Sequence, residues 1–160
     1  MSLALRLLLA FVFTLHVSAA PNEQSEIQEL YRRGLQGDAQ AVLACISKLE
    51  AVMQREPANQ VARVYLGSAY TLRSRDLGFG PKKLQTLRRG LAVMDEAVAA
   101  APSEPKVRLA RALTTSALPA IFGRRAESRK DFAMLADQAG QHPEKFEAAD
   151  LQIVLSHRGR

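Results

Sequence analysis

The residues that could perform catalysis or hold a metal are few in this 160-residue chain, and they lie apart. His142 and His157 have no second ligand at a spacing typical of zinc sites. Asp95 and Glu96 are neighbours on an expected helix, so their carboxylates point in different directions and do not form a catalytic pair. Cys45, the only cysteine, lies among apolar residues at helical spacing, which indicates a buried thiol. The sequence therefore predicts no catalytic site, no metal site and no cofactor.

Basic side chains are the most prominent polar feature. Residues 73–89 contain six basic residues against one acidic residue, and residues 106–130 contain seven against one. Two interpretations stay open: a solvated face with a bias in sign, or a binding surface for an anionic partner. The residues expected on this surface, named here the basic rim, are Arg73, Arg75, Lys82, Lys83, Arg88, Arg89, Arg108, Arg111, Arg124 and Arg125.

The elements that would position these residues are expected to be helices. Apolar residues make up 48% of the chain and charged residues 24%, and no run of alternating β-branched residues indicates a strand. Apolar residues recur at helical spacing in segments that proline and glycine interrupt. Pro57, Pro102 and Pro143 follow one another at intervals of 45 and 41 residues and are expected to close successive helical hairpins.

The second of these hairpins resembles a tetratricopeptide repeat (TPR). Arg63, Leu66, Gly67 and Tyr70 match the spacing W-x2-L-G-x2-Y, with Arg in place of Trp, and Gly90, Met94 and Pro102 match A-x3-F followed by proline, with Gly in place of Ala. Between Gly67 and Gly90 lie about 11 more residues than a regular unit has. Gly67 and Gly90 are expected to let the two helices of the hairpin approach closely.

The resemblance implies an all-α fold in which antiparallel helical hairpins stack as a short right-handed superhelix. In such proteins the first helix of each hairpin lines a groove that receives a peptide or a helix of a partner protein. By register, the resemblance places seven residues in this partner-binding groove: Val61, Val64, Ser68, Thr71, Lys106, Leu109 and Leu113.

The first 20 residues have the pattern of a secretory signal peptide. Arg6 precedes an apolar segment from residue 7 to 17, and Ser18, Ala19 and Ala20 supply the small residues of a cleavage site. Cleavage after Ala19 is favoured over cleavage after Ala20, because the latter would put Pro21 at the first mature position. We therefore expect one exported domain, residues 21–160, in the periplasm or secreted.

The resemblance implies a TPR-like scaffold for protein–protein interaction, and the N-terminal pattern predicts that it is exported; no enzymatic activity is expected. The alternative is a periplasmic protein whose basic flank binds an anion or an anionic membrane surface. An exported protein rarely meets nucleic acid, so no nucleic acid partner is expected. Phe79, in the insertion at residues 76–81, is expected either to fold back as a lid over the core or to form a contact arm with the basic residues around it.

Overall fold

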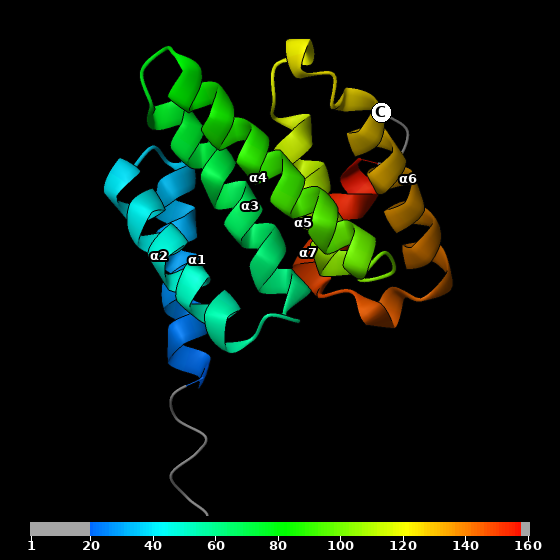
Figure 1. Ribbon diagram of the computed structural model, residues 1–160. Coiled ribbons are helices and arrows are strands. Elements are labelled where there is room, and N and C mark those ends of the chain that lie inside the picture. Colours follow the sequence, from blue (N-terminus) through cyan, green and yellow to red (C-terminus); the bar gives the residue numbers. More distant parts are fainter. Residues whose placement is uncertain (1–19, 158–160) are drawn as a thin grey trace, which may run out of the picture.

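The computed structural model describes residues 20–157, which form seven α-helices and two short 3-10 helices (Figure 1). In chain order the elements are α1 (Ala20–Leu35), α2 (Ala39–Arg55), α3 (Gln60–Asp76), α4 (Pro81–Ala100), α5 (Pro105–Ser116), η1 (Ala120–Phe122), α6 (Arg125–Gln141), η2 (Pro143–Lys145) and α7 (Ala148–Ser156). The predicted all-α fold is confirmed for this part of the chain, which contains no strand. The predicted signal peptide, apart from Ala20, lies outside it. Among the described helices, none has both the length and the hydropathy of a membrane span.

Capping residues and prolines set the ends of the helices. The carboxylate of Asp38 accepts hydrogen bonds from two backbone N–H groups in the first turn of α2, and Asn59 accepts one from α3. Pro57, Pro102 and Pro143 follow α2, α4 and α6 respectively, as predicted, because the residue before a proline is driven out of the α region.

Consecutive helices pack as hairpins, α1 with α2, α3 with α4, and α5 with α6, while α7 packs against α5 and α6. The first helices of the hairpins also contact one another, α1 with α3, α3 with α5, and α5 with α7. These four helices form an inner layer, and α2, α4 and α6 lie outside it. The arrangement is compatible with a helical repeat, and in Figure 1 the connections within the three hairpins lie at one end of the stack.

Two glycines allow α3 and α4 to approach each other closely. A Cβ added to Gly67 would lie 2.7 Å from the carbonyl oxygen of Gly90 and 2.9 Å from the backbone nitrogen of Met94. A Cβ added to Gly90 would lie 2.6 Å from the carbonyl oxygen of Gly67. Because both neighbours are backbone atoms, neither position has room for a side chain. The predicted role of these glycines is confirmed.

Three clusters of buried apolar side chains follow one another along the stack. The first joins α1, α2 and α3, the second α3, α4 and α5, and the third α5, α6 and α7. Cys45 belongs to the first cluster and is 1% exposed, and its burial raises the pKa of the thiol to about 11. The prediction of a buried cysteine is therefore confirmed.

The extra residues of the second hairpin lengthen its helices instead of forming a long loop. The helix α3 has 17 residues and α4 has 20, so that only residues 77–80 connect them. The lid interpretation of Phe79 is wrong, because its side chain projects from this loop with a relative exposure of 105%. Gly80 completes the turn with φ 153° and ψ −179°, a conformation that is almost restricted to glycine.

Candidate functional site

The candidate site is a groove of about 720 Å³ on the inner layer of helices. Helices α1, α3 and α5 supply most of its wall, α4 and α7 contribute at its ends, and the segment after α5 extends it. Most of the lining is apolar, and its volume lies in the ordinary range for ligand sites. The apolar side chains and alanines on the wall are Leu35, Leu72, Leu87, Leu109, Ala110, Leu113, Ala117, Leu118 and Phe122.

Five of the seven residues predicted to line a partner-binding groove lie on this wall: Ser68, Thr71, Lys106, Leu109 and Leu113. The other two do not. Val64 is buried in the second cluster with Met94 and Val107, and Val61 packs against the same cluster. The reason is that this part of α3 packs against both α4 and α5 in that cluster.

Tyr31 and Tyr65 both line the groove, although the sequence did not predict them as groove residues. Their rings pack edge to face, with centroids 5.2 Å apart and planes at 87°. Burial raises the pKa of the Tyr65 phenol to about 12. Helical spacing indicated that α1 has an apolar face that includes Tyr31, but no local pattern shows that this face meets a cavity.

A chain of hydroxyl groups crosses the floor of the groove and links three helices. The Tyr31 hydroxyl lies 2.6 Å from Ser68 Oγ, and Ser68 Oγ lies 2.7 Å from Thr114 Oγ1. The Thr114 hydroxyl donates a hydrogen bond to the carbonyl oxygen of Ala110 at 2.8 Å. Since each hydroxyl has one proton, Ser68 donates to Thr114 and Tyr31 donates to Ser68. The floor therefore offers only acceptor lone pairs to a ligand along this chain.

The two ends of the groove differ in charge. One end is formed by the start of α5 and by α7, and there Lys106 pairs with Glu147. The pKa of Asp150, at the same end, is raised mainly by burial and also by the negative charge of Glu147. At the other end, Arg75 donates to the carbonyl oxygen of Gly34 at 2.9 Å and pairs with Asp76. Lys83 donates to the carbonyl oxygen of Leu77 at 3.2 Å at this same end.

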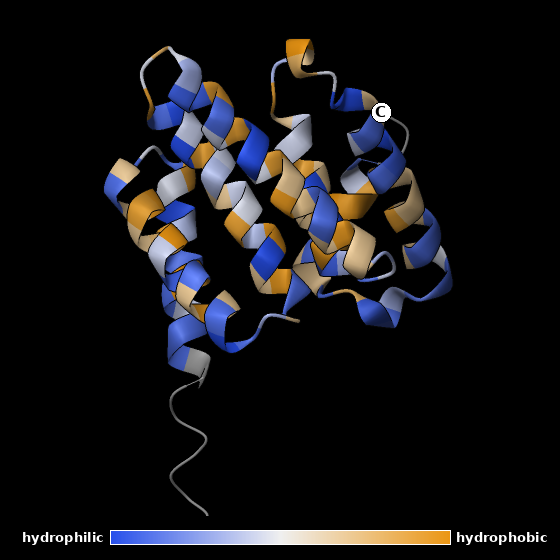
Figure 2. Ribbon diagram, in the orientation of Figure 1, coloured by the Kyte–Doolittle hydropathy of each residue, from blue (hydrophilic) through white to orange (hydrophobic). Residues whose placement is uncertain are grey.

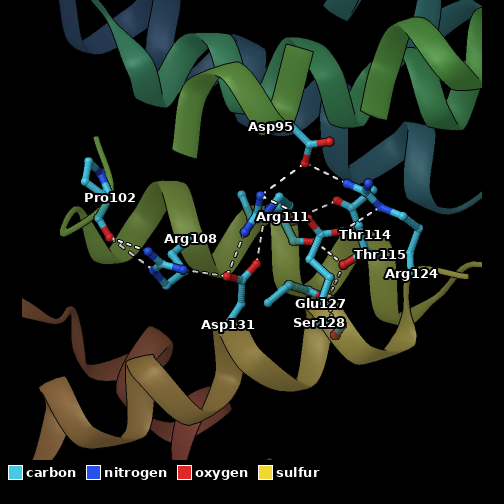
Figure 3. Close-up of polar contacts among 12 residues, drawn as sticks. Asp95, Pro102, Arg108, Arg111, Thr114, Thr115, Arg124, Glu127, Ser128 and Asp131 are labelled. Atoms are coloured by element: carbon cyan, nitrogen blue, oxygen red, sulfur yellow. Dashed lines mark hydrogen bonds and ion pairs between the residues drawn. The ribbon is translucent and has the colours of Figure 1, made fainter. Parts of the chain in front are cut away.

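Three arginines that the sequence placed on the basic rim lie instead in an ion-pair network among α4, α5 and α6 (Figure 3). Arg108 donates to Asp131 at 2.6 Å, and Arg111 donates to both oxygens of Asp131 at 2.8 Å. The Asp131 side chain is 1% exposed. Arg124 pairs with Asp95 at 2.6 Å and with Glu127 at 2.7 Å.

This network corrects the prediction of a rim for Arg108 and Arg111, whereas Arg124 is partly buried, with a side chain 20% exposed. The side chain of Arg108 is only 7% exposed and that of Arg111 only 11%, so neither is available to an external partner. Their carboxylate partners come from other helices, and a count of charges along short segments cannot show them. The network holds α4, α5 and α6 together, and its role is structural.

The other residues of the basic rim remain on the surface to different extents. Lys82, Arg88 and Arg125 are exposed, and Arg73 is half-buried. The guanidinium of Arg89 lies 4.2 Å above the Tyr70 ring and 3.6 Å from Glu50. Arg75 and Lys83 contribute to the end of the groove.

The residues considered for catalysis remain apart in the structure. His142 pairs with Glu144 at 3.2 Å, and the His157 ring stacks on Phe132 with centroids 4.2 Å apart. Within residues 20–157 no group of three His, Cys, Asp or Glu side chains is placed to hold a metal ion. The groove is therefore the candidate binding site in the described part of the chain. No protein-family model, curated protein sequence or solved structure matches this chain.

Proposed function

We propose that this protein is an exported, non-catalytic scaffold of stacked TPR-like hairpins in a right-handed superhelix. Its groove binds an apolar segment of another protein. The observation that carries the proposal is the mostly apolar wall of the groove, formed by the first helices of successive hairpins. A soluble domain leaves such a surface open when a ligand or partner covers it.

The shape and polarity of the groove favour a short amphipathic helix or an extended peptide. From Tyr65 to Arg75 the wall formed by α3 is about 15 Å long at 1.5 Å per residue, which matches about three helical turns. Apolar side chains of the partner lie on the leucines of α3 and α5. A carboxylate of the partner fits the end with Arg75 and Lys83, which gives the complex one orientation.

The proposal is tested with a library of random peptides displayed on phage and selected against the protein. We expect enrichment of peptides with apolar residues at helical or alternating spacing. One enriched peptide is then synthesised, and its affinity is measured by fluorescence anisotropy. Leu113→Gln and Leu72→Gln, which place an amide in the wall, should weaken binding about tenfold or more.

Leu43→Gln is the matched control, because Leu43 is exposed on α2 and does not line the groove. Its affinity for the peptide should equal that of the unchanged protein. Thermal unfolding of each variant shows that the fold is retained. Selection without enrichment, or peptides that bind both groove variants as well as the unchanged protein, would overturn the proposal.

A further inference from the structure

Two loops at one end of the stack carry apolar side chains that contact almost nothing in the protein. Phe79 projects from residues 77–80 with a relative exposure of 105%, and Ile121 projects from η1 with 88%. Both loops lie at the same end of the stack in Figure 1, where the first follows α3 and the second follows α5. In Figure 2 both loops contain segments coloured as hydrophobic. We propose that this end, named here the loop end, docks on an anionic lipid bilayer with Phe79 and Ile121 inserted at the headgroup–acyl boundary.

The apolar character of the loop end extends beyond these two tips. Leu35, the last residue of α1, is 55% exposed where the groove wall meets this end, and Leu84, in the first turn of α4, is 46% exposed. Four of the seven large apolar residues exposed in the described part of the chain therefore lie at this end. Single exposed apolar residues are ordinary, but a gathering of them at one end marks a contact surface.

An exposed cation lies next to each of the two loops in the chain. Lys82 follows the first loop and Arg125 follows the second, both are exposed, and neither forms an ion pair within residues 20–157. From residue 73 to 83 there are four basic residues and one acidic residue, a net charge of +3 (4 − 1). Because anionic lipids attract such cations and the apolar tips enter the interface, the two features favour the same partner.

The separation of the tips favours a bilayer over a folded protein. Phe79 and Ile121 stand on different loops, and each exposes almost its whole side chain, whereas the contact residues of protein interfaces gather in one packed patch. A lipid surface deforms around each tip and needs no matching pocket.

Both loops are also ordered by internal contacts: Lys83 donates to the Leu77 carbonyl oxygen at 3.2 Å, and Gly123 donates to the Ala120 carbonyl oxygen at 2.9 Å. Docking then needs little ordering of the loops.

The insertion is tested in the full chain with an environment-sensitive NBD fluorophore on single introduced cysteines. The variants are Phe79→Cys, Ile121→Cys and Met134→Cys; Met134, 43% exposed on α6 away from the loop end, is the control. Cys45 is buried and stays unlabelled. With vesicles that contain phosphatidylglycerol, we expect a blue shift and quenching by nitroxide lipids at positions 79 and 121, and neither at 134. No change at 79 and 121, or an equal change at 134, would overturn the proposal.

The role of charge is tested by vesicle sedimentation with the same full chain. Lys82→Gln and Arg125→Gln should each lower binding about fivefold, and Lys145→Gln, at the opposite end, should change it by less than about twofold. Vesicles of phosphatidylcholine alone should bind more weakly than vesicles with phosphatidylglycerol. If Lys145→Gln lowers binding as much as the two loop-end changes do, the chain binds lipid without using the loop end, and the proposal is wrong.

The loop end and the groove are tested by different variants. Leu113→Gln should leave vesicle binding unchanged, since Leu113 lies on the groove wall. Phe79→Ser should lower vesicle binding and leave peptide binding unchanged, since Phe79 does not line the groove. Loss of both activities in both variants would contradict the assignment of two separate surfaces, so the failure of one proposal can be distinguished from that of the other.

Discussion

Asp131 is the residue on which the interior ion pairs depend most. Its carboxylate, 1% exposed, accepts hydrogen bonds from both Arg108 and Arg111. Among residues 20–157, Asp131→Asn removes the one charge that pairs with Arg108, whose remaining partner is the carbonyl oxygen of Pro102. We expect a loss of about 3–5 kcal/mol in the free energy of unfolding, measured by urea denaturation.

Asp137→Asn provides the control, because Asp137 is exposed on the same helix, α6. Its urea midpoint should stay close to that of the unchanged protein. Equal midpoints for Asp131→Asn and Asp137→Asn would mean that water or another group replaces the lost charge.

Single residues differed in how far the sequence could predict them. The burial of Cys45 could be predicted, because the apolar residues that form its helix face lie within one or two turns of α2. The interior position of Arg108, Arg111 and Arg124 could not, because Asp95 and Asp131 are 16 to 29 positions away from the arginines they bind. Only the packing of α4, α5 and α6 brings these groups together.

The hairpin of α3 and α4 is the element whose packing leaves the least room for change. A methyl group on Gly67 would meet backbone atoms of α4 at 2.7 and 2.9 Å, so the two helices would have to separate. We expect Gly67→Ala to lower the free energy of unfolding by about 1–3 kcal/mol, and Gly67→Leu by more. The measurement is again urea denaturation.

Gly140→Ala is the matched control for this prediction. Gly140 lies in the last turn of α6, and apart from its chain neighbours and the adjacent backbone of α6 no atom is within 4 Å of the position that its Cβ would take. Alanine is the better helix former, so this change should stabilise the protein by up to about 1 kcal/mol. If Gly67→Ala is as stable as Gly140→Ala, the close contact between α3 and α4 has no energetic importance.

The boundaries of the elements were easier to predict than the faces they present. Prolines and capping residues act within one turn of the chain, so the ends of α2, α4 and α6 could be located from the sequence. The face of α3 that meets the groove depends on how α3 packs against α4 and α5. That packing buries Val64 with Met94 and Val107 and leaves Ser68 and Thr71 on the groove wall, and no residue within α3 encodes it.

At the scale of the whole molecule, the two proposed contacts use different surfaces. The groove lies along the inner layer, whereas Phe79 and Ile121 project from loops at the end of the stack. The end of the groove near Arg75 and Lys83 adjoins the first of these loops, because both residues flank residues 77–80. A partner segment close to a membrane could thus reach the groove while the loop end rests on the lipid surface.

Export is the prediction on which both proposed contacts depend, because it decides which proteins and lipids the chain meets. Signal peptidase requires small residues just before the cut, and Val17, Ser18 and Ala19 are followed by Ala20 and then Pro21. Mass spectrometry of the protein from its native cells should show a chain that begins at Ala20 or Pro21, with cleavage after Ala19 favoured.

A bulky residue at the predicted cleavage site tests whether the first segment is a cleaved signal peptide or an apolar segment that the protein retains. Ala19→Leu should slow processing or move the cut to the bond after Ala20, because leucine does not fit the site that accepts the residue before the cut. Ala10→Leu, in the apolar segment where leucine is already common, should be processed normally. An intact N-terminus on a cytoplasmic protein would show that the first 20 residues are not a signal peptide. The partners would then have to be sought among cytoplasmic proteins and the inner face of the membrane.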